Sequence, residues 1–284
     1  MQQSEYICLN GKFNLSTDPV FKLNNRAFRY GDALFETIYA SGGVIPFFRD
    51  HYDRLTRSMK ILKMQCPPEF TRDILHKEIT GLLTRNKLFQ GARIRLTVFR
   101  DGGGLYSPDS NNIAYLIEAT RIDNDRFILN DKGFIIDVYD HIKKPVNILS
   151  NLKTTNSLLY VLAGIYKKEN GIDDCIILNE NNIICEAISS NIFIAKDNVI
   201  LTPSLESGCV SGIMRERIIN IAADMNYTVY DDSHFNTNEL LTADELFLTN
   251  AVAGIRWVLG FKKRRYYNRI AKIITKRLNE VTFS

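Results

Sequence analysis

The sequence predicts an α+β protein whose chain is organised in two halves. Helix-like and strand-like patterns are mixed along its 284 residues without the strict alternation of a parallel doubly wound fold. A polar stretch, RIDNDR at 121–126, separates the halves and is the best candidate for a linker. The length suffices for one large domain or two modest ones, each with a buried core.

The first half opens with short strand-like pieces and then shows two apolar runs around Gly42-Gly43, a pattern typical of a β-hairpin. A helix should follow from about Asp50, because apolar residues recur there at helical intervals. The other elements expected in this half are a helix over 70–85 and strands over 92–100 and 112–120.

The second half carries more strands than helices in its pattern. We expect strands near 133–138, 174–178, 182–185, 191–195 and 198–201, and helices over 156–168, 212–225 and 266–279.

Composition restricts location and metal chemistry. No apolar run approaches the roughly 18 residues that a membrane span needs, and the first residues lack the pattern of a signal peptide. We therefore expect a cytoplasmic protein without membrane contact. The five cysteines are scattered without CxxC spacing and the four histidines are dispersed, so we expect mostly buried, reduced thiols and no metal site.

The net charge of +4 is concentrated near the C-terminus, where residues 262–265 read KKRR. Such a cluster could bind nucleic acid. However, isoleucine and leucine recur at helical spacing among the following charges, at Ile270, Ile273, Ile274 and Leu278. We therefore expect an amphipathic helix here and no nucleic-acid partner.

Lys153 stands among small polar residues in SNLKTTN, just before an apolar helix pattern. A lysine amine has a reference pKa of about 10.4, and a desolvated or positively charged pocket lowers this value enough for Schiff-base chemistry. Taken alone, the position is better explained by an ordinary surface lysine.

Three other places could assist such chemistry. Glu186 ends a predicted strand, and the turn at 208–212 opens a predicted helix, whose free N–H groups could hold a phosphate. His51 and Arg54 share one face of the first helix, where the arginine could bind a phosphate or form an ordinary ion pair.

Taken together, these segments resemble the class-IV aminotransferase family, the fold-type IV enzymes that depend on pyridoxal 5'-phosphate (PLP). The resemblance runs from about Asn25 to Val258 and rests on the order and spacing of NRAFRYGDALFET, HYDRL, SNLKTTN, CEAISSNIF, TPSLESG, GIMRERI and ADELFLTNAVAGI.

The resemblance implies a role for each site residue. Lys153 matches the catalytic Schiff-base lysine, Glu186 the carboxylate that pairs with the pyridine nitrogen, and Arg54 the arginine that binds the cofactor phosphate. The other cofactor-binding positions are Ile213, Met214, Asn250 and Ala251, and the candidate substrate-binding residues are Tyr30, Arg100 and Tyr106.

The same resemblance implies an architecture. We expect a smaller N-terminal α/β domain over 1–120, an interdomain loop over 121–128 and a larger C-terminal α+β cofactor domain over 129–284. The cofactor should lie in the cleft between the domains. Because members of this family usually form homodimers, we expect a symmetric dimer that binds a small amino substrate.

Two activities remain open. Thr249-Asn250-Ala251 is similar to the 4-amino-4-deoxychorismate lyases, which release pyruvate and leave the folate precursor 4-aminobenzoate, whereas aminotransferases usually carry threonine where Ala251 stands. The lyase is our leading hypothesis, and an aminotransferase of the branched-chain or D-amino-acid type in amino-acid metabolism is the alternative. Leu105 and Trp257 depart from the family pattern, so the residue that holds the substrate carboxylate is undefined.

Two other classes of function receive less support. A binding protein that kept the fold but lost activity would not need the lysine, glutamate and arginine together. A serine hydrolase would need a GxSxG nucleophile elbow, which the sequence lacks.

Overall fold

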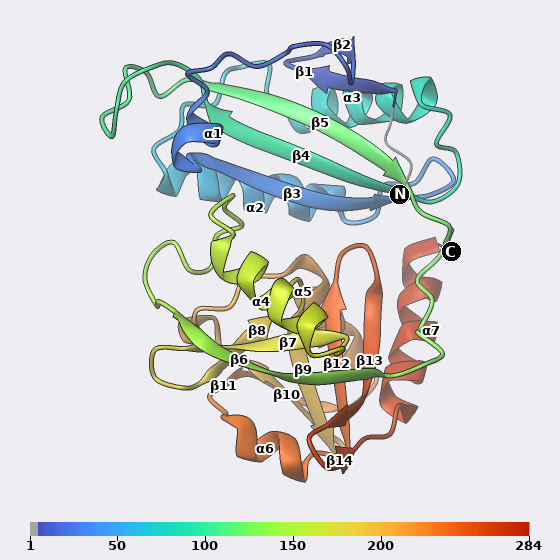
Figure 1. Cartoon of the computed structure of the whole chain (residues 1–284). Helices are drawn as coiled ribbons and strands as arrows, with labels where there is room; N and C mark the ends of the chain where they lie inside the picture. Colours follow the sequence, from blue (N-terminus) through green and yellow to red (C-terminus); the bar gives the residue numbers. More distant parts are fainter. Residues whose placement is uncertain (1–4, 284) are drawn as a thin grey trace. The chain divides into compact units, whose positions relative to one another are not determined.

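The computed structural model describes residues 5–283 and divides the chain into two compact units (Figure 1). Unit 1 contains the chain up to Arg126 together with Lys153–Asn156, and unit 2 contains Phe127–Leu152 and the chain from Ser157 onward. The mixture of helices and strands in both units confirms the α+β class. Nothing in the sequence indicated that residues 153–156 would return to unit 1.

Unit 1 is built on a five-stranded antiparallel sheet with the order β2-β1-β5-β4-β3. In β4, apolar side chains alternate with polar ones, so that Ile94, Leu96 and Val98 are buried on one face. Helix α2 packs against β3, and α3 packs against β1 and β5. The elements are β1 (Tyr6–Leu9), β2 (Lys12–Leu15), α1 (Arg26–Tyr30), β3 (Ala33–Ala40), α2 (Phe48–Ile61), α3 (Arg72–Arg85), β4 (Ala92–Arg100) and β5 (Ile113–Arg121).

The hairpin predicted around Gly42-Gly43 is wrong. Only an isolated bridge joins Ser41 to Val44, and the second apolar run leads into α2 instead of forming a strand. Pro46 has no N–H to offer a strand partner, and Phe47 adopts a left-handed conformation with φ of 57° directly before the helix. Strand β3 pairs along its whole length with β4, which follows more than fifty residues later.

Unit 2 is built on a nine-stranded mixed sheet, in which the order is β11-β10-β9-β12-β13-β6-β7-β8 and β14 pairs with β13. Helix α4 packs against β6 and β7, whereas α5 packs against α7, β11 and β12. The elements are β6 (Phe134–Lys144), α4 (Leu158–Glu169), β7 (Asp174–Asn179), β8 (Ile184–Ala187), β9 (Asn191–Lys196), β10 (Val199–Pro203), the 3-10 helix η1 (Leu205–Ser207), α5 (Ile213–Asp224), β11 (Thr228–Ser233), α6 (Thr237–Thr242), β12 (Glu245–Asn250), β13 (Gly254–Phe261), β14 (Arg264–Arg265) and α7 (Arg269–Phe283).

The C-terminal helix α7 confirms the amphipathic interpretation of the basic segment. Ile274 and Leu278 are fully buried, while Ile273 is about half exposed, at 47%. The buried carboxylate of Glu245 accepts hydrogen bonds from the N–H groups of Ile270 at 2.9 Å and Ala271 at 3.2 Å. An acidic group at this end stabilises the helix because it faces the positive end of the helix dipole. Within residues 5–283, no helix is long and apolar enough to cross a membrane.

The cysteines are free thiols, as expected, and four of the five are buried. Cys66 is the exposed one and belongs to unit 1. Burial raises the pKa of Cys8 and Cys175 to about 12, with nearby carboxylates adding to the effect, and it raises the pKa of Cys66 as well.

Candidate cofactor and active site

Lys153 is fixed to an edge of the unit 1 sheet through its backbone. Its carbonyl accepts a hydrogen bond from the N–H of Phe35 at 2.9 Å, and the N–H of Thr155 donates to the carbonyl of Ala33 at 3.1 Å. These bonds extend the edge strand β3 by a short partner segment, in which Thr154 pairs with Leu34. The lysine backbone is therefore held by the sheet and not by a free loop.

The Lys153 side chain lies against an aromatic ring that it shares with a second cation. Its Nζ atom is 4.5 Å from the centroid of the Phe35 ring, and Cζ of Arg95 is 3.8 Å from the same centroid. Burial lowers the pKa of the Arg95 guanidinium, with Glu118 acting in the opposite direction. Arg95 was not expected from the sequence to take part in the site, although an arginine in the middle of the apolar pattern ARIRLTVFR is a recognisable signal.

Arg54 is buried in unit 1 beside a carboxylate that the sequence analysis also missed. Its Nε donates to Oε1 of Glu36 at 2.8 Å, and its Nη2 contacts Oε2 of the same residue. Nδ1 of His51 lies 2.7 Å from that Oε2. Burial alone would raise the pKa of Glu36, but Arg54 and His51 outweigh it and lower this pKa to about 2. The ion pair left open for Arg54 by the sequence is confirmed, and its phosphate contact stays a prediction.

Arg100 donates its hydrogen bonds within unit 1. Its Nε donates to Oδ2 of Asp32 at 3.0 Å, its Nη2 donates to the carbonyl of Leu62 at 2.8 Å, and its Nη1 contacts Oδ1 of Asn111. The side chain is 8% exposed. To bind a substrate carboxylate, Arg100 would have to exchange one of these partners.

The glycine-rich loop is anchored by an arginine that the sequence did not single out. Nη1 of Arg26 donates to the carbonyls of Gly103, Gly104 and Leu105 at 3.1, 3.2 and 2.7 Å. This anchor brings together two predicted substrate-binding residues, since the rings of Tyr30 and Tyr106 have centroids 5.7 Å apart. Tyr106 is 91% exposed, so its ring is available for a ligand.

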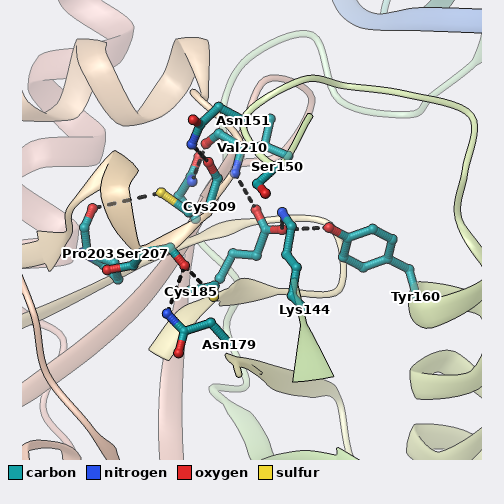
Figure 2. Close-up of polar contacts among 12 residues, drawn as sticks. Lys144, Ser150, Asn151, Tyr160, Asn179, Cys185, Pro203, Ser207, Cys209 and Val210 are labelled. Carbon is teal, nitrogen blue, oxygen red and sulfur yellow. Dashed lines mark hydrogen bonds and ion pairs between the residues drawn. The ribbon is translucent and has the colours of Figure 1, made fainter. Parts of the chain in front are cut away.

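In unit 2, the carboxylate of Glu186 is the centre of a buried polar cluster (Figure 2). Its Oε1 accepts hydrogen bonds from Nζ of Lys144 and the hydroxyl of Tyr160, both at 2.6 Å. Its Oε2 accepts a hydrogen bond from the N–H of Val210 at 2.8 Å. A carboxylate oxygen can accept two hydrogen bonds. Among the described residues, Oε1 has both donors and Oε2 has one, so a further donor can be accepted at Oε2.

The groups around this carboxylate differ in charge. Burial and the nearby Glu186 raise the pKa of Tyr160, so the hydroxyl stays a neutral donor. Burial and Glu186 also raise the pKa of Cys185 and Cys209 to about 12, which keeps both thiols neutral. The positive charge that compensates the carboxylate comes from Lys144.

The turn before α5 is held by two asparagines. Nδ2 of Asn191 donates to the carbonyl of Val210 at 2.9 Å. Nδ2 of Asn151 donates to the carbonyl of Cys209 at 2.7 Å (Figure 2). Gly212 is the N-cap of α5, and no side chain caps the helix there. A Cβ atom on Gly212 would meet Oδ1 of Asn191 at 1.9 Å, so the close approach of backbone and side chain requires glycine.

This helix start suits an anion. The first N–H groups of an α-helix lack partners within the helix and carry partial positive charge. Ile213 and Met214, predicted to supply such groups, form the first turn of α5 and have buried side chains. Asn250 has a structural role: its Oδ1 accepts hydrogen bonds from Val252 and Ala253, and its Nδ2 donates to Ser190 Oγ at 3.1 Å. It ends β12, directly before Ala251.

These features of unit 2 fit PLP. The free acceptor position on Glu186 suits the N–H of a protonated pyridine ring, and the uncapped start of α5 suits a phosphate group.

Comparison with known proteins identifies the family. The profile of the family described as amino-transferase class IV matches residues 33–260, and the chain belongs to this family. Enzymes of this family depend on PLP, so the predicted cofactor is confirmed at the level of the family.

Its relatives carry two different activities in their names. A putative branched-chain-amino-acid aminotransferase from Methanocaldococcus jannaschii is 31% identical, over 96% of this chain and 94% of that protein. An aminodeoxychorismate lyase from Vibrio harveyi is 26% identical, over 84% of this chain and 86% of that protein. The crystal structure of a branched-chain aminotransferase from Thermoproteus uzoniensis with norvaline has a TM-score of 0.88, at 25% identity, and covers 98% of this chain and 94% of that one.

Proposed function

We propose that this chain is a PLP-dependent enzyme in which Lys153 binds the cofactor covalently and Glu186 pairs with its pyridine nitrogen. The observation that carries the proposal is the buried Glu186 carboxylate, which is fixed on three sides and has one acceptor position left. Family membership supports the same assignment.

When bound, PLP supplies an electron sink for negative charge that develops on the substrate carbon next to the amine. The Glu186 carboxylate favours the protonated form of the pyridine nitrogen by Coulomb attraction. Nζ of Lys153 would be the group that removes and returns the proton at that carbon. Arg54 and the N–H groups of Ile213 and Met214 would hold the phosphate.

Unit 1 supplies the residues that we propose to bind the substrate. Tyr106 supplies exposed aromatic surface beside the partly buried ring of Tyr30, and Arg26 fixes the loop by donating to the Gly103–Leu105 carbonyls. For the substrate carboxylate we favour Arg95 over Arg100, because Arg95 shares the Phe35 ring with Lys153, whereas the N–H groups of Arg100 are already bonded within unit 1.

Of the two activities in the family, we put 4-amino-4-deoxychorismate lyase first. The supporting observation is the Thr249-Asn250-Ala251 segment at the end of β12, where the predicted phosphate position has a methyl group in place of a threonine hydroxyl. The lyase from Vibrio harveyi is a relative over most of both chains. The enzyme would then release pyruvate and 4-aminobenzoate and serve folate biosynthesis in the cytoplasm.

An amino-acid aminotransferase is the second candidate. It is favoured by the 31% identity to the archaeal protein named as a branched-chain aminotransferase, which spans nearly the whole of both chains. Such an enzyme needs a 2-keto acid as a second substrate and shows ping-pong kinetics, whereas the lyase needs one substrate.

The test uses the purified protein loaded with PLP. A visible absorbance band that borohydride removes, and that Lys153→Ala lacks, would support covalent attachment at Lys153. Pyruvate release from aminodeoxychorismate without any keto acid would support the lyase. Bleaching of the band by an amino acid and its return with a keto acid would instead support the aminotransferase. Absence of the band in the wild type would refute the proposal.

We also propose that the chain forms a homodimer, as members of its family usually do. Light scattering of the purified protein should give twice the mass of the 32.6 kDa chain. A monomer mass would contradict this expectation.

A further inference from the structure

We propose that Lys144 and Tyr160 are positioning residues that prepare Glu186 for the cofactor: Lys144 keeps the carboxylate ionised before PLP arrives, and Tyr160 fixes its orientation. This inference rests on the proposed function, in which Glu186 receives the pyridine nitrogen. Neither residue was expected from the sequence to take part in the site, and both reach Glu186 from different elements, β6 and α4.

The two carboxylate oxygens of Glu186 have different hydrogen-bond partners. Oε1 accepts from Nζ of Lys144 and from the hydroxyl of Tyr160, both at 2.6 Å, and hydrogen bonds to an ionised carboxylate are stronger than those between neutral groups. Oε2 has the N–H of Val210 at 2.8 Å and one free position. Because Oε1 is held by two side chains, the carboxylate cannot rotate without breaking both bonds. Oε2 is therefore the oxygen presented to a ligand.

The charge balance explains why a lysine is needed. An ionised carboxylate that is only 4% exposed is costly unless a cation lies beside it. Among the described contacts, Lys144 supplies the only cation bonded to Glu186, so without it the buried carboxylate has no compensating charge until PLP binds. A neutral carboxyl would lack the negative charge that stabilises a protonated pyridine nitrogen.

The other groups that face Glu186 do not replace this charge. Tyr160 from α4, Cys185 from β8 and Cys209 from the turn before α5 all have raised pKa values because of burial and the carboxylate itself. Arg215 of α5 donates to the carbonyls of Pro203 and Asp231 instead. Tyr160, Cys185 and Cys209 should therefore stay neutral between about pH 6 and pH 9.

The test measures the affinity of the apo protein for PLP by absorbance as a function of pH. For Lys144→Met we expect PLP binding to weaken by about tenfold or more at the acidic end of the pH range, because the buried carboxylate has lost the cation beside it. Binding should recover towards the wild-type value as the pH is raised. Lys144→Arg should behave as the wild type, because it restores a cation.

Three further variants separate the possible explanations. Lys143→Met is the matched control, because its side chain is adjacent in sequence but forms no bond with Glu186 among the described contacts, and it should leave PLP affinity unchanged. Tyr160→Phe should weaken PLP binding several-fold at every pH, because it removes a neutral donor. Lys144→Met combined with Glu186→Gln should bind weakly without pH dependence, and it keeps the test valid if the single variant fails to fold.

The outcomes are distinguishable from failure of the proposed function. If the wild type forms no PLP adduct, the proposed function is wrong. If the wild type binds PLP and Lys144→Met binds it with the same affinity and pH dependence, the role of Lys144 is refuted while the proposed function stands. If Tyr160→Phe binds PLP as the wild type does, the orienting role of Tyr160 is refuted.

Discussion

Two buried carboxylates, one in each unit, are paired with basic side chains, and the two are arranged differently. Glu36 in unit 1 is 1% exposed and is held by Arg54 and His51, both from helix α2. Glu186 in unit 2 is 4% exposed and is held by Lys144, Tyr160 and the Val210 N–H, which come from β6, α4 and the turn before α5.

The difference teaches how a buried charge can serve stability or binding. Both oxygens of Glu36 are bonded by side chains one turn apart on a single helix, so the cluster is complete when the helix docks. Glu186 instead gathers donors from three separate elements. The first arrangement is an ion pair with one helix, and the second is assembled from three elements around the position proposed for a charged ligand.

Removing the carboxylate of Glu36 should have the largest effect. In Glu36→Gln, the buried guanidinium of Arg54 loses its anionic partner, and we expect the free energy of unfolding to fall by about 3–5 kcal/mol. Denaturant unfolding measures this change, and the exposed Glu69→Gln should be neutral. If Glu36→Gln is as stable as the wild type, the cluster has no structural role.

Removing the carboxylate of Glu186 should mainly lower the rate of the reaction. We expect Glu186→Gln to lower kcat by roughly 10²–10³-fold, the usual result of losing one preorganised electrostatic contact. Its loss of stability should be smaller than that of Glu36→Gln, because the amide oxygen can still accept from Tyr160 or Val210. Steady-state kinetics on the PLP-loaded enzyme, alongside unfolding, tests the order. If Glu186→Gln lost more stability than Glu36→Gln, this comparison of the two carboxylates would be wrong.

The free energy of unfolding at acid pH should depend on the protonation of Glu36. The pKa of this carboxyl is lowered from 4.5 to about 2 in the folded protein, so the unfolded chain binds the proton more readily. The stability contributed by Glu36 is therefore complete above pH 4.5 and is lost as the pH falls towards 2. Unfolding measured across this range should show a weaker acid dependence in Glu36→Gln than in the wild type. Equal slopes would contradict the assignment.

A smaller effect should come from the turn beside Glu186. Gly212→Ala places a Cβ where Oδ1 of Asn191 lies, so the turn must shift and the first N–H groups of α5 move with it. We expect PLP affinity to fall by about tenfold, or roughly 1.4 kcal/mol, with little change in unfolding. Gly164→Ala in helix α4, where an added Cβ meets nothing within 4 Å, is the control. Unchanged PLP affinity in Gly212→Ala would exclude the turn from the phosphate site.

Much of the fold could be read from periodic patterns, and the misses have physical causes. Strand β4 coincides with the predicted range 92–100, because alternation in it is regular. Strands β12 and β13 were not predicted, since they are buried on both faces and show no alternation. The site residues that motifs carry were identified by resemblance. Glu36, Arg95, Lys144 and Tyr160 were missed because their roles depend on contacts between distant segments.

The exposure of a single cysteine gives this protein a practical property. Cys66 lies on the surface of unit 1, while the four other thiols are buried. A maleimide dye or a spin label should therefore couple at one position of the native sequence, without any cysteine being removed. Because burial raises the pKa of Cys66 somewhat, the coupling should proceed best at mildly alkaline pH. The protein labelled at Cys66 can then be used to measure its motions by fluorescence or spin resonance.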